Sequence, residues 1–135
     1  ATTYALKTGA LLGVVIDMAV IVAPPGAAAT RYLQQFASAV GLAFQIRDDL
    51  FDAGAGPAFA LDDLMGKDTG QDAGKATLPG ALGIEAARNR MESEVRRAGQ
   101  CLQGALGPDN RTRLLLSALF PDCGLPGTPL VMRAR

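Results

Sequence analysis

The chain has 135 residues, enough for one domain with its own hydrophobic core and too few for two. Apolar residues make up 49% and charged residues 19%, which indicates a folded protein, and the prevalence of alanine and leucine favours helices. Thirteen basic and thirteen acidic residues cancel, so no net charge draws the chain to nucleic acids or anionic membranes.

Two catalytic classes are excluded by composition. The chain has no histidine and only two cysteines, without metal-like spacing, so neither a Ser-His-Asp triad nor a zinc site is expected within it. Two cysteines also make no disulfide framework, and no signal peptide is recognisable. We therefore expect a cytoplasmic protein.

The first predicted helix covers residues 3–22 and ends before Pro24, because a proline ring cannot continue a helix. Its apolar run, residues 11–23, is too short to span a bilayer and is interrupted by Asp17. We therefore predict a buried core helix and no membrane span. Asp17 is expected to have a partner within the bundle or at a subunit contact.

A second helix is predicted from Thr30, as its N-cap, to about residue 52. Its apolar stripe recurs at three- and four-residue steps, at Leu33, Phe36, Val40 and Phe44. A glycine- and aspartate-rich connection follows over residues 54–77, with at most a short helical turn near residues 61–65. A connection of this length inside a compact domain is uncommon unless it is functional.

A third helix is predicted to begin at Pro79 and to bury one face, formed by Ile84, Ala87, Met91, Val95, Ala98 and Leu102. Its opposite side carries charges at ion-pair spacing, namely Arg88, Glu92 and Arg96. A shorter helix is predicted over residues 110–120, and residues 121–135 are expected to form an irregular tail. Since no strand pattern is present, residues 1–135 are predicted to form a single all-α domain.

The acidic residues are concentrated in one part of the chain. Seven of the thirteen fall within 25 residues, and all seven are aspartates: Asp48, Asp49, Asp52, Asp62, Asp63, Asp68 and Asp72. Short carboxylates gathered in this way suit a hard divalent cation such as magnesium. An acidic surface loop is the alternative, and composition does not separate the two.

The sharpest part of this cluster lies on the second helix. One helical stripe, with steps of three, one and three residues, contains Gln45, Asp48, Asp49 and Asp52. Like charges four residues apart destabilise a bare helix by about 0.2–0.5 kcal/mol per pair, so a bound cation is a natural partner. An ordinary solvated acidic face is the alternative interpretation.

Basic residues flank these aspartates in a pattern that suits a diphosphate. Lys7 and Thr8 precede Gly9 on the first helix, and Lys67 and Lys75 each follow a glycine in the connection. A diphosphate is bound by lysine charges, by backbone amides that glycine leaves accessible, and by magnesium held on aspartates. Each lysine alone would most simply be a solvated surface residue. Their combination, in this order along the chain, indicates a diphosphate site.

Together these segments resemble the trans-isoprenyl diphosphate synthases, the polyprenyl synthetase family of farnesyl and geranylgeranyl diphosphate synthases. The resemblance covers residues 6–97 and follows the order of that family's second half. It is carried by residues 7–11, 41–52, 66–67 and 74–79.

The resemblance implies an antiparallel helical bundle of the isoprenoid synthase type, of which this chain would be the C-terminal half. It implies a prenyltransferase that condenses isopentenyl diphosphate with an allylic diphosphate to form a longer linear isoprenoid diphosphate. It also implies Mg²⁺ as the cofactor and a homodimer of the complete enzyme.

Site residues follow from the same resemblance. The family's second aspartate-rich motif is matched by Asp48, Asp49 and Asp52. The resemblance implies that they ligate magnesium, with Asp48 the foremost ligand. The family's diphosphate-binding lysines are matched by Lys7, Lys67 and Lys75. Thr8 and Gln45 match positions that line the reacting centre, so the implied catalytic set is Lys7, Thr8, Gln45, Asp48 and Lys67.

The family's first aspartate-rich motif has no counterpart here. Asp62 and Asp63 match the loop after the second motif instead. The missing N-terminal half would be a separate chain that assembles with this one or a part of the protein outside this sequence; the third alternative is a degenerate, non-catalytic relative. A regulatory subunit of a prenyl synthase, a terpene cyclase of the same fold and a plain helical interaction module are the competing functions.

Overall fold

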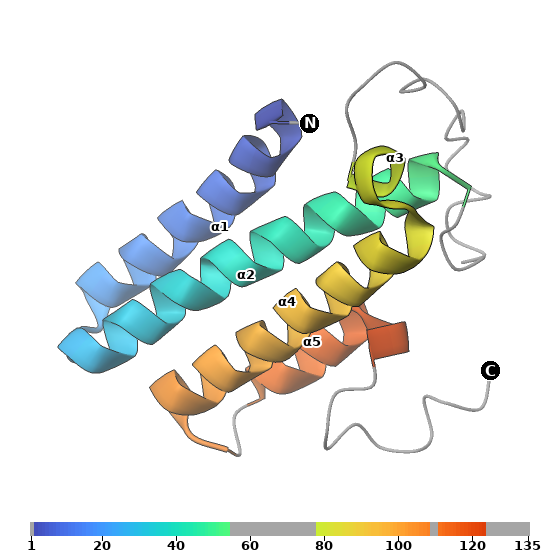
Figure 1. Cartoon of the computed structure of the whole chain (residues 1–135). Coiled ribbons are helices and arrows are strands. Elements are labelled where there is room, and N and C mark those ends of the chain that lie inside the picture. Colours follow the sequence, from blue (N-terminus) through green and yellow to red (C-terminus); the bar gives the residue numbers. More distant parts are fainter. Residues whose placement is uncertain (1, 55–77, 109–110, 124–135) are drawn as a thin grey trace.

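The computed structural model describes residues 2–54, 78–108 and 111–123. All regular elements within these ranges are helical: α1 (Thr2–Val22), α2 (Ala27–Asp52), α3 (Leu78–Leu82), α4 (Ile84–Leu106), α5 (Thr112–Leu119) and the short 3-10 helix η1 (Pro121–Cys123). Figure 1 shows α2 between α1 and α4, with both neighbours antiparallel to it, and α5 packed beside α4. The all-α prediction is confirmed.

The hairpin between α1 and α2 turns at a glycine. α1 ends at Val22, two residues before the prolines, and Gly26 has a φ of 96°, a conformation that favours glycine. α2 therefore begins at Ala27, and the prediction of Thr30 as the N-cap is wrong. The Thr30 hydroxyl instead donates a hydrogen bond to the Gly26 carbonyl oxygen at 2.8 Å, from within the helix.

The predicted third helix is two helices. Gly83 separates α3 from α4 with a φ of 87°, which ends the regular helix started at Leu78. Because Ile84 is then the first residue of α4, its side chain is 40% exposed, and its predicted burial is wrong. The remaining members of the predicted face are buried as expected: Ala87, Met91, Val95, Ala98 and Leu102.

The charged side of α4 is partly as predicted. Arg96 and Glu92 form the expected pair, with a nitrogen–oxygen distance of 3.9 Å. Glu94, whose position was not singled out, is buried and is paired with Arg90 at 2.9 Å and with Arg97 at 3.2 Å. Two flanking arginines compensate the desolvation of its carboxylate.

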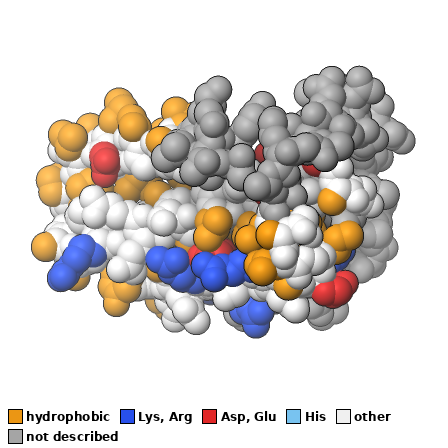
Figure 2. Space-filling model, turned by 45° about the horizontal axis from the view of Figure 1, so that its top comes forward, with side chains coloured by type: hydrophobic (Ala, Val, Ile, Leu, Met, Phe, Trp, Pro, Cys, Tyr) orange, Lys and Arg blue, Asp and Glu red, His pale blue; other side chains and the backbone are white. Residues whose placement is uncertain are grey.

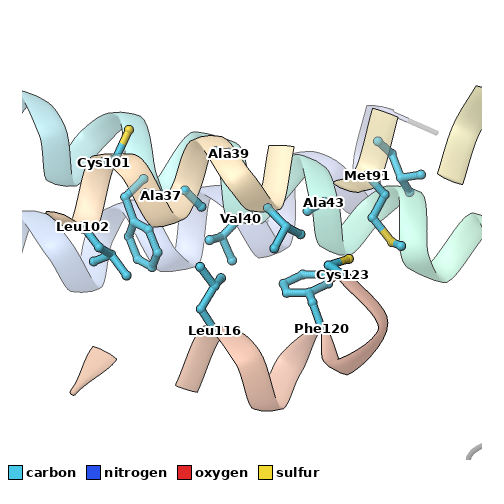
Figure 3. Close-up of a cluster of buried hydrophobic side chains, with 14 of the residues drawn as sticks. Ala37, Ala39, Val40, Ala43, Met91, Cys101, Leu102, Leu116, Phe120 and Cys123 are labelled. Atoms are coloured by element: carbon cyan, nitrogen blue, oxygen red, sulfur yellow. The ribbon is translucent and has the colours of Figure 1, made fainter. Parts of the chain in front are cut away.

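The hydrophobic core lies between α2, α4 and α5. The largest fully buried side chains come from all three helices and are Ile46, Val95, Leu102 and Leu116. Figure 3 shows Leu116 and Phe120 pointing from the α5 segment toward Val40 and Ala43 of α2. Phe36 and Val40 are buried and Leu33 and Phe44 are packed against the core, so the predicted stripe of α2 is confirmed.

α1 is apolar on two sides. Ile16 is buried, and Leu12 and Val20 pack against the core beside it. Its other side is exposed, so the prediction of a buried core helix is wrong for this side. It carries Leu11, Val14, Val15, Met18, Ile21 and Val22, which we call the outer face of α1. Figure 2 shows hydrophobic side chains gathered over this helix. None of the helices in the described ranges is long and apolar enough to cross a membrane.

Candidate diphosphate site

The aspartates of the candidate site occupy the C-terminal end of α2. Asp52 is the last residue of the helix and is exposed, Asp48 is half-buried, and Asp49 is only 8% exposed. Gln45 Nε2 donates a hydrogen bond to Asp49 Oδ1 at 3.1 Å. The stripe therefore contains one carboxylate held within the protein and two that lie nearer to solvent.

The electrostatics of this helix end favour a cation. The C-terminus of a helix carries a partial negative charge, and acidic side chains placed there are destabilising. Asp48, Asp49 and Asp52 lie within the final five residues of α2, and its last turn contains no basic residue. The helix thus adds its own negative end to three carboxylates.

Arg47 connects this helix end to α5. Its Nη1 donates a hydrogen bond to the Leu119 carbonyl oxygen at 2.8 Å, which satisfies one of the carbonyls left without a partner at the end of α5. Its guanidinium lies 4.2 Å from the ring centroid of Phe44 and 5.6 Å from that of Phe120. The two rings meet edge to face, 5.5 Å apart.

The backbones of α1 and α2 touch close to the candidate site. A Cβ atom added to Gly41 would lie 2.7 Å from Gly9 Cα and 3.4 Å from Gly9 N. Real Cβ atoms do not come this close to backbone, so the contact requires glycine at position 41. The helical segment that carries Lys7 and Thr8 is therefore held directly against α2; their side chains lie outside the described part of the structure.

Other predicted site residues lie outside the described ranges. Lys67 and Lys75 both belong to residues 55–77, as do Asp62 and Asp63. Within residues 2–54, 78–108 and 111–123, no three His, Cys, Asp or Glu side chains form a group placed to hold a metal ion together. The donor chemistry at the end of α2 nevertheless fits magnesium, which prefers carboxylate oxygens and is commonly held by one or two carboxylates together with substrate phosphates.

Arg47 is the residue of this region to which the sequence analysis assigns no role. Its hydrogen-bond acceptor lies 72 residues away in the chain, so no local sequence pattern predicts the contact. The only available signal was its spacing of three residues from Phe44, which places a cation and an aromatic ring on one helix face.

These features define an antiparallel all-α bundle with an aspartate-rich helix end beside a lysine-bearing helix. The chain belongs to the polyprenyl synthetase family, whose model matches residues 2–107. The match includes the whole of α1, α2, α3 and α4, and so covers the whole candidate site.

Similar proteins include synthases of two product lengths. The chain is 35% identical to a geranylgeranyl diphosphate synthase of Pantoea ananas over 118 residues, which cover 87% of this chain and 36% of that protein. It is 36% identical to a farnesyl diphosphate synthase of Escherichia coli over 98 residues, 72% of this chain and 32% of that protein. A chloroplastic geranylgeranyl pyrophosphate synthase of Arabidopsis thaliana is 31% identical over 119 residues, 87% of this chain and 31% of its own length.

The chain thus spans about a third of the length of these relatives. No solved structure matches it at a significant level.

Proposed function

We propose that this chain supplies the second aspartate-rich motif of a trans-prenyltransferase. The enzyme condenses isopentenyl diphosphate with an allylic diphosphate to form a longer linear isoprenoid diphosphate. Membership of the polyprenyl synthetase family supports this reaction class, and similarity to both farnesyl and geranylgeranyl diphosphate synthases supports the substrate class.

Asp48, Asp49 and Asp52 are the proposed magnesium ligands. Magnesium, when bound, supplies positive charge that stabilises the leaving diphosphate. The observation that carries this proposal is the accumulation of three carboxylates at the negative end of α2, with no basic residue in the last turn. A site that binds a cation gains from this arrangement.

The other residues have roles that do not require the metal. Lys7, Lys67 and Lys75 are proposed to bind diphosphate oxygens as point charges. Gln45 holds the Asp49 carboxylate through its amide and, with Thr8, is proposed to line the reacting centre. As the allylic carbon–oxygen bond breaks, the double bond of isopentenyl diphosphate forms the new carbon–carbon bond and a proton is then lost, while apolar surroundings keep water from the carbocation.

The outer face of α1 supports a further part of the proposal, that other helices complete the bundle. A contiguous exposed apolar face marks a surface that other parts of a protein cover, and the six exposed apolar residues of this face match that description. Since the relatives are about three times as long as the matched region, the missing N-terminal half of the bundle is the proposed cover. Homodimerisation of the complete enzyme and a cytoplasmic location remain predictions.

Calorimetry tests the proposed site. The chain, assembled with the polypeptide that completes its bundle, is titrated with a non-hydrolysable bisphosphonate with and without Mg²⁺. We expect metal-dependent binding that Asp48→Ala weakens by about tenfold or more, because a charge-assisted interaction is lost. Glu85→Gln, which removes an exposed acid from the first turn of α4, serves as the control and should bind like the wild type.

Two results would refute the proposal. One is a wild-type complex that binds no bisphosphonate in the presence of Mg²⁺. The other is equal binding by Asp48→Ala and Glu85→Gln, which would place the site away from α2.

A further inference from the structure

The Gly9–Gly41 contact fixes the register of α1 on α2. The helices are antiparallel, so the direction from Gly9 toward Lys7 is also the direction from Gly41 toward Gln45 and Asp48. At a rise of about 1.5 Å per residue, Lys7 lies about 3 Å beyond the contact along its axis, and Asp48 about 10 Å beyond it. The backbone positions of Lys7 and Asp48 are thus offset by about 7 Å along the helix axes.

The contact is rigid because it involves only backbone. The atoms closest to a Cβ built at Gly41 are the Cα and the amide nitrogen of Gly9, neither of which can move by changing a rotamer. Carbon atoms in favourable contact are about 3.5–4.0 Å apart, so an alanine at position 41 must separate the helices by about 1 Å. Gly9 differs, since a Cβ added there would meet Gly41 Cα at an ordinary 3.8 Å.

We infer that Gly41 is a positioning residue, whose missing side chain sets the distance between Lys7 and the aspartates so that both reach the same diphosphate. This inference rests on the proposed function and adds to it a residue that touches neither substrate nor metal. A displacement of about 1 Å in such an arrangement can reduce the reaction rate by as much as 100-fold.

A double-mutant cycle tests the inference. The affinity of the completed bundle for inorganic diphosphate is measured by calorimetry at saturating Mg²⁺ for the wild type, Gly41→Ala, Lys7→Ala and the double variant. We expect Gly41→Ala to weaken binding by about tenfold or more. We also expect Lys7→Ala to weaken the wild type but to add little in the Gly41→Ala background, because a displaced lysine has no contribution left to lose.

Two control variants separate positioning from general packing. Gly13→Ala lies one turn along α1 with open space around its Cβ, and should change the affinity by less than about twofold. Gly104→Ala crowds the Tyr32 ring, whose atoms lie 3.0 Å from the added Cβ, at the other end of α2. It should leave diphosphate binding unchanged.

A second variant is available in case Gly41→Ala fails to fold. If Gly41→Ala does not unfold cooperatively, Gly9→Val replaces it in the cycle, because its branched carbons extend beyond a Cβ position already in contact with Gly41.

The outcomes are distinct. The inference is overturned if the wild type binds diphosphate and the effects of the two substitutions are additive. It is also overturned if Gly41→Ala binds as the wild type does. Both results leave the proposed function standing. Absence of metal-dependent binding by the wild type overturns the proposed function and the inference together.

Discussion

Arg47 illustrates how a single side chain connects the candidate site to the rest of the molecule. It follows Gln45 by two residues and directly precedes Asp48, yet it donates its hydrogen bond to the end of α5. Its buried Nε has no hydrogen-bond partner among the described residues, so its position is set by the Leu119 carbonyl and the two phenylalanine rings. Such a residue holds the end of α2 in place without entering the site.

Arg47→Leu is therefore expected to destabilise the fold. The substitution removes a hydrogen bond from a charged donor and a cation–π contact, and should lower the free energy of unfolding by about 1–3 kcal/mol. Urea unfolding of the completed bundle measures the change. Arg31→Leu, at an exposed position of the same helix, should cost less than about 0.5 kcal/mol. Equal losses in the two variants would show that the Arg47 contacts do not contribute.

Residue types at the site were readable from the sequence, whereas their surroundings were not. The spacing of Asp48, Asp49 and Asp52 placed them on one helix, as observed. That Asp49 is buried and receives a hydrogen bond from Gln45 depends on packing around α2, which a helical period does not describe. Likewise, no apolar pattern predicts that the charged side chain of Glu94 is buried.

At the scale of elements, periodicity predicted the helices and missed two of their limits. Apolar spacing identified the buried faces of α2 and α4 because the core residues of each helix recur at three- and four-residue steps. Both missed limits, the start of α2 and the break before α4, occur at glycines with positive φ, Gly26 and Gly83. A glycine in the sequence permits this conformation but does not require it, so propensity alone placed neither boundary.

α5 offers a matched pair of leucines for testing the core. Leu116 is 2% exposed and points toward α2, whereas its neighbour Leu115 is 57% exposed. Leu116→Ala is expected to lower the free energy of unfolding by about 2–5 kcal/mol through lost burial and a residual cavity. Leu115→Ala should cost less than about 1 kcal/mol, as measured by the same urea titration. A larger loss for Leu115 would mean that α5 is rotated relative to the described packing.

On the scale of the whole molecule, α1 is the helix whose exposed apolar face is not covered by any other described part of this chain. It contacts α2 on one side and presents an apolar surface on the other. A patch of this kind marks an interaction surface, and here it lies on the helix that carries Lys7. The surface proposed to receive the missing helices and the proposed diphosphate site thus share one helix, so assembly and substrate binding are expected to depend on each other.

The most direct measurement of the central claim locates the metal. Mn²⁺, which accepts the same carboxylate ligands as Mg²⁺, is added with diphosphate to the completed bundle carrying this chain labelled with ¹⁵N. Paramagnetic broadening of amide signals is predicted to be strongest at residues 48–52, to extend to the first turns of α1, and to fade along α2 toward Ala27, about 30 Å away. Broadening centred on α4 or α5, or on the end of α2 with α1 unaffected, would contradict the account.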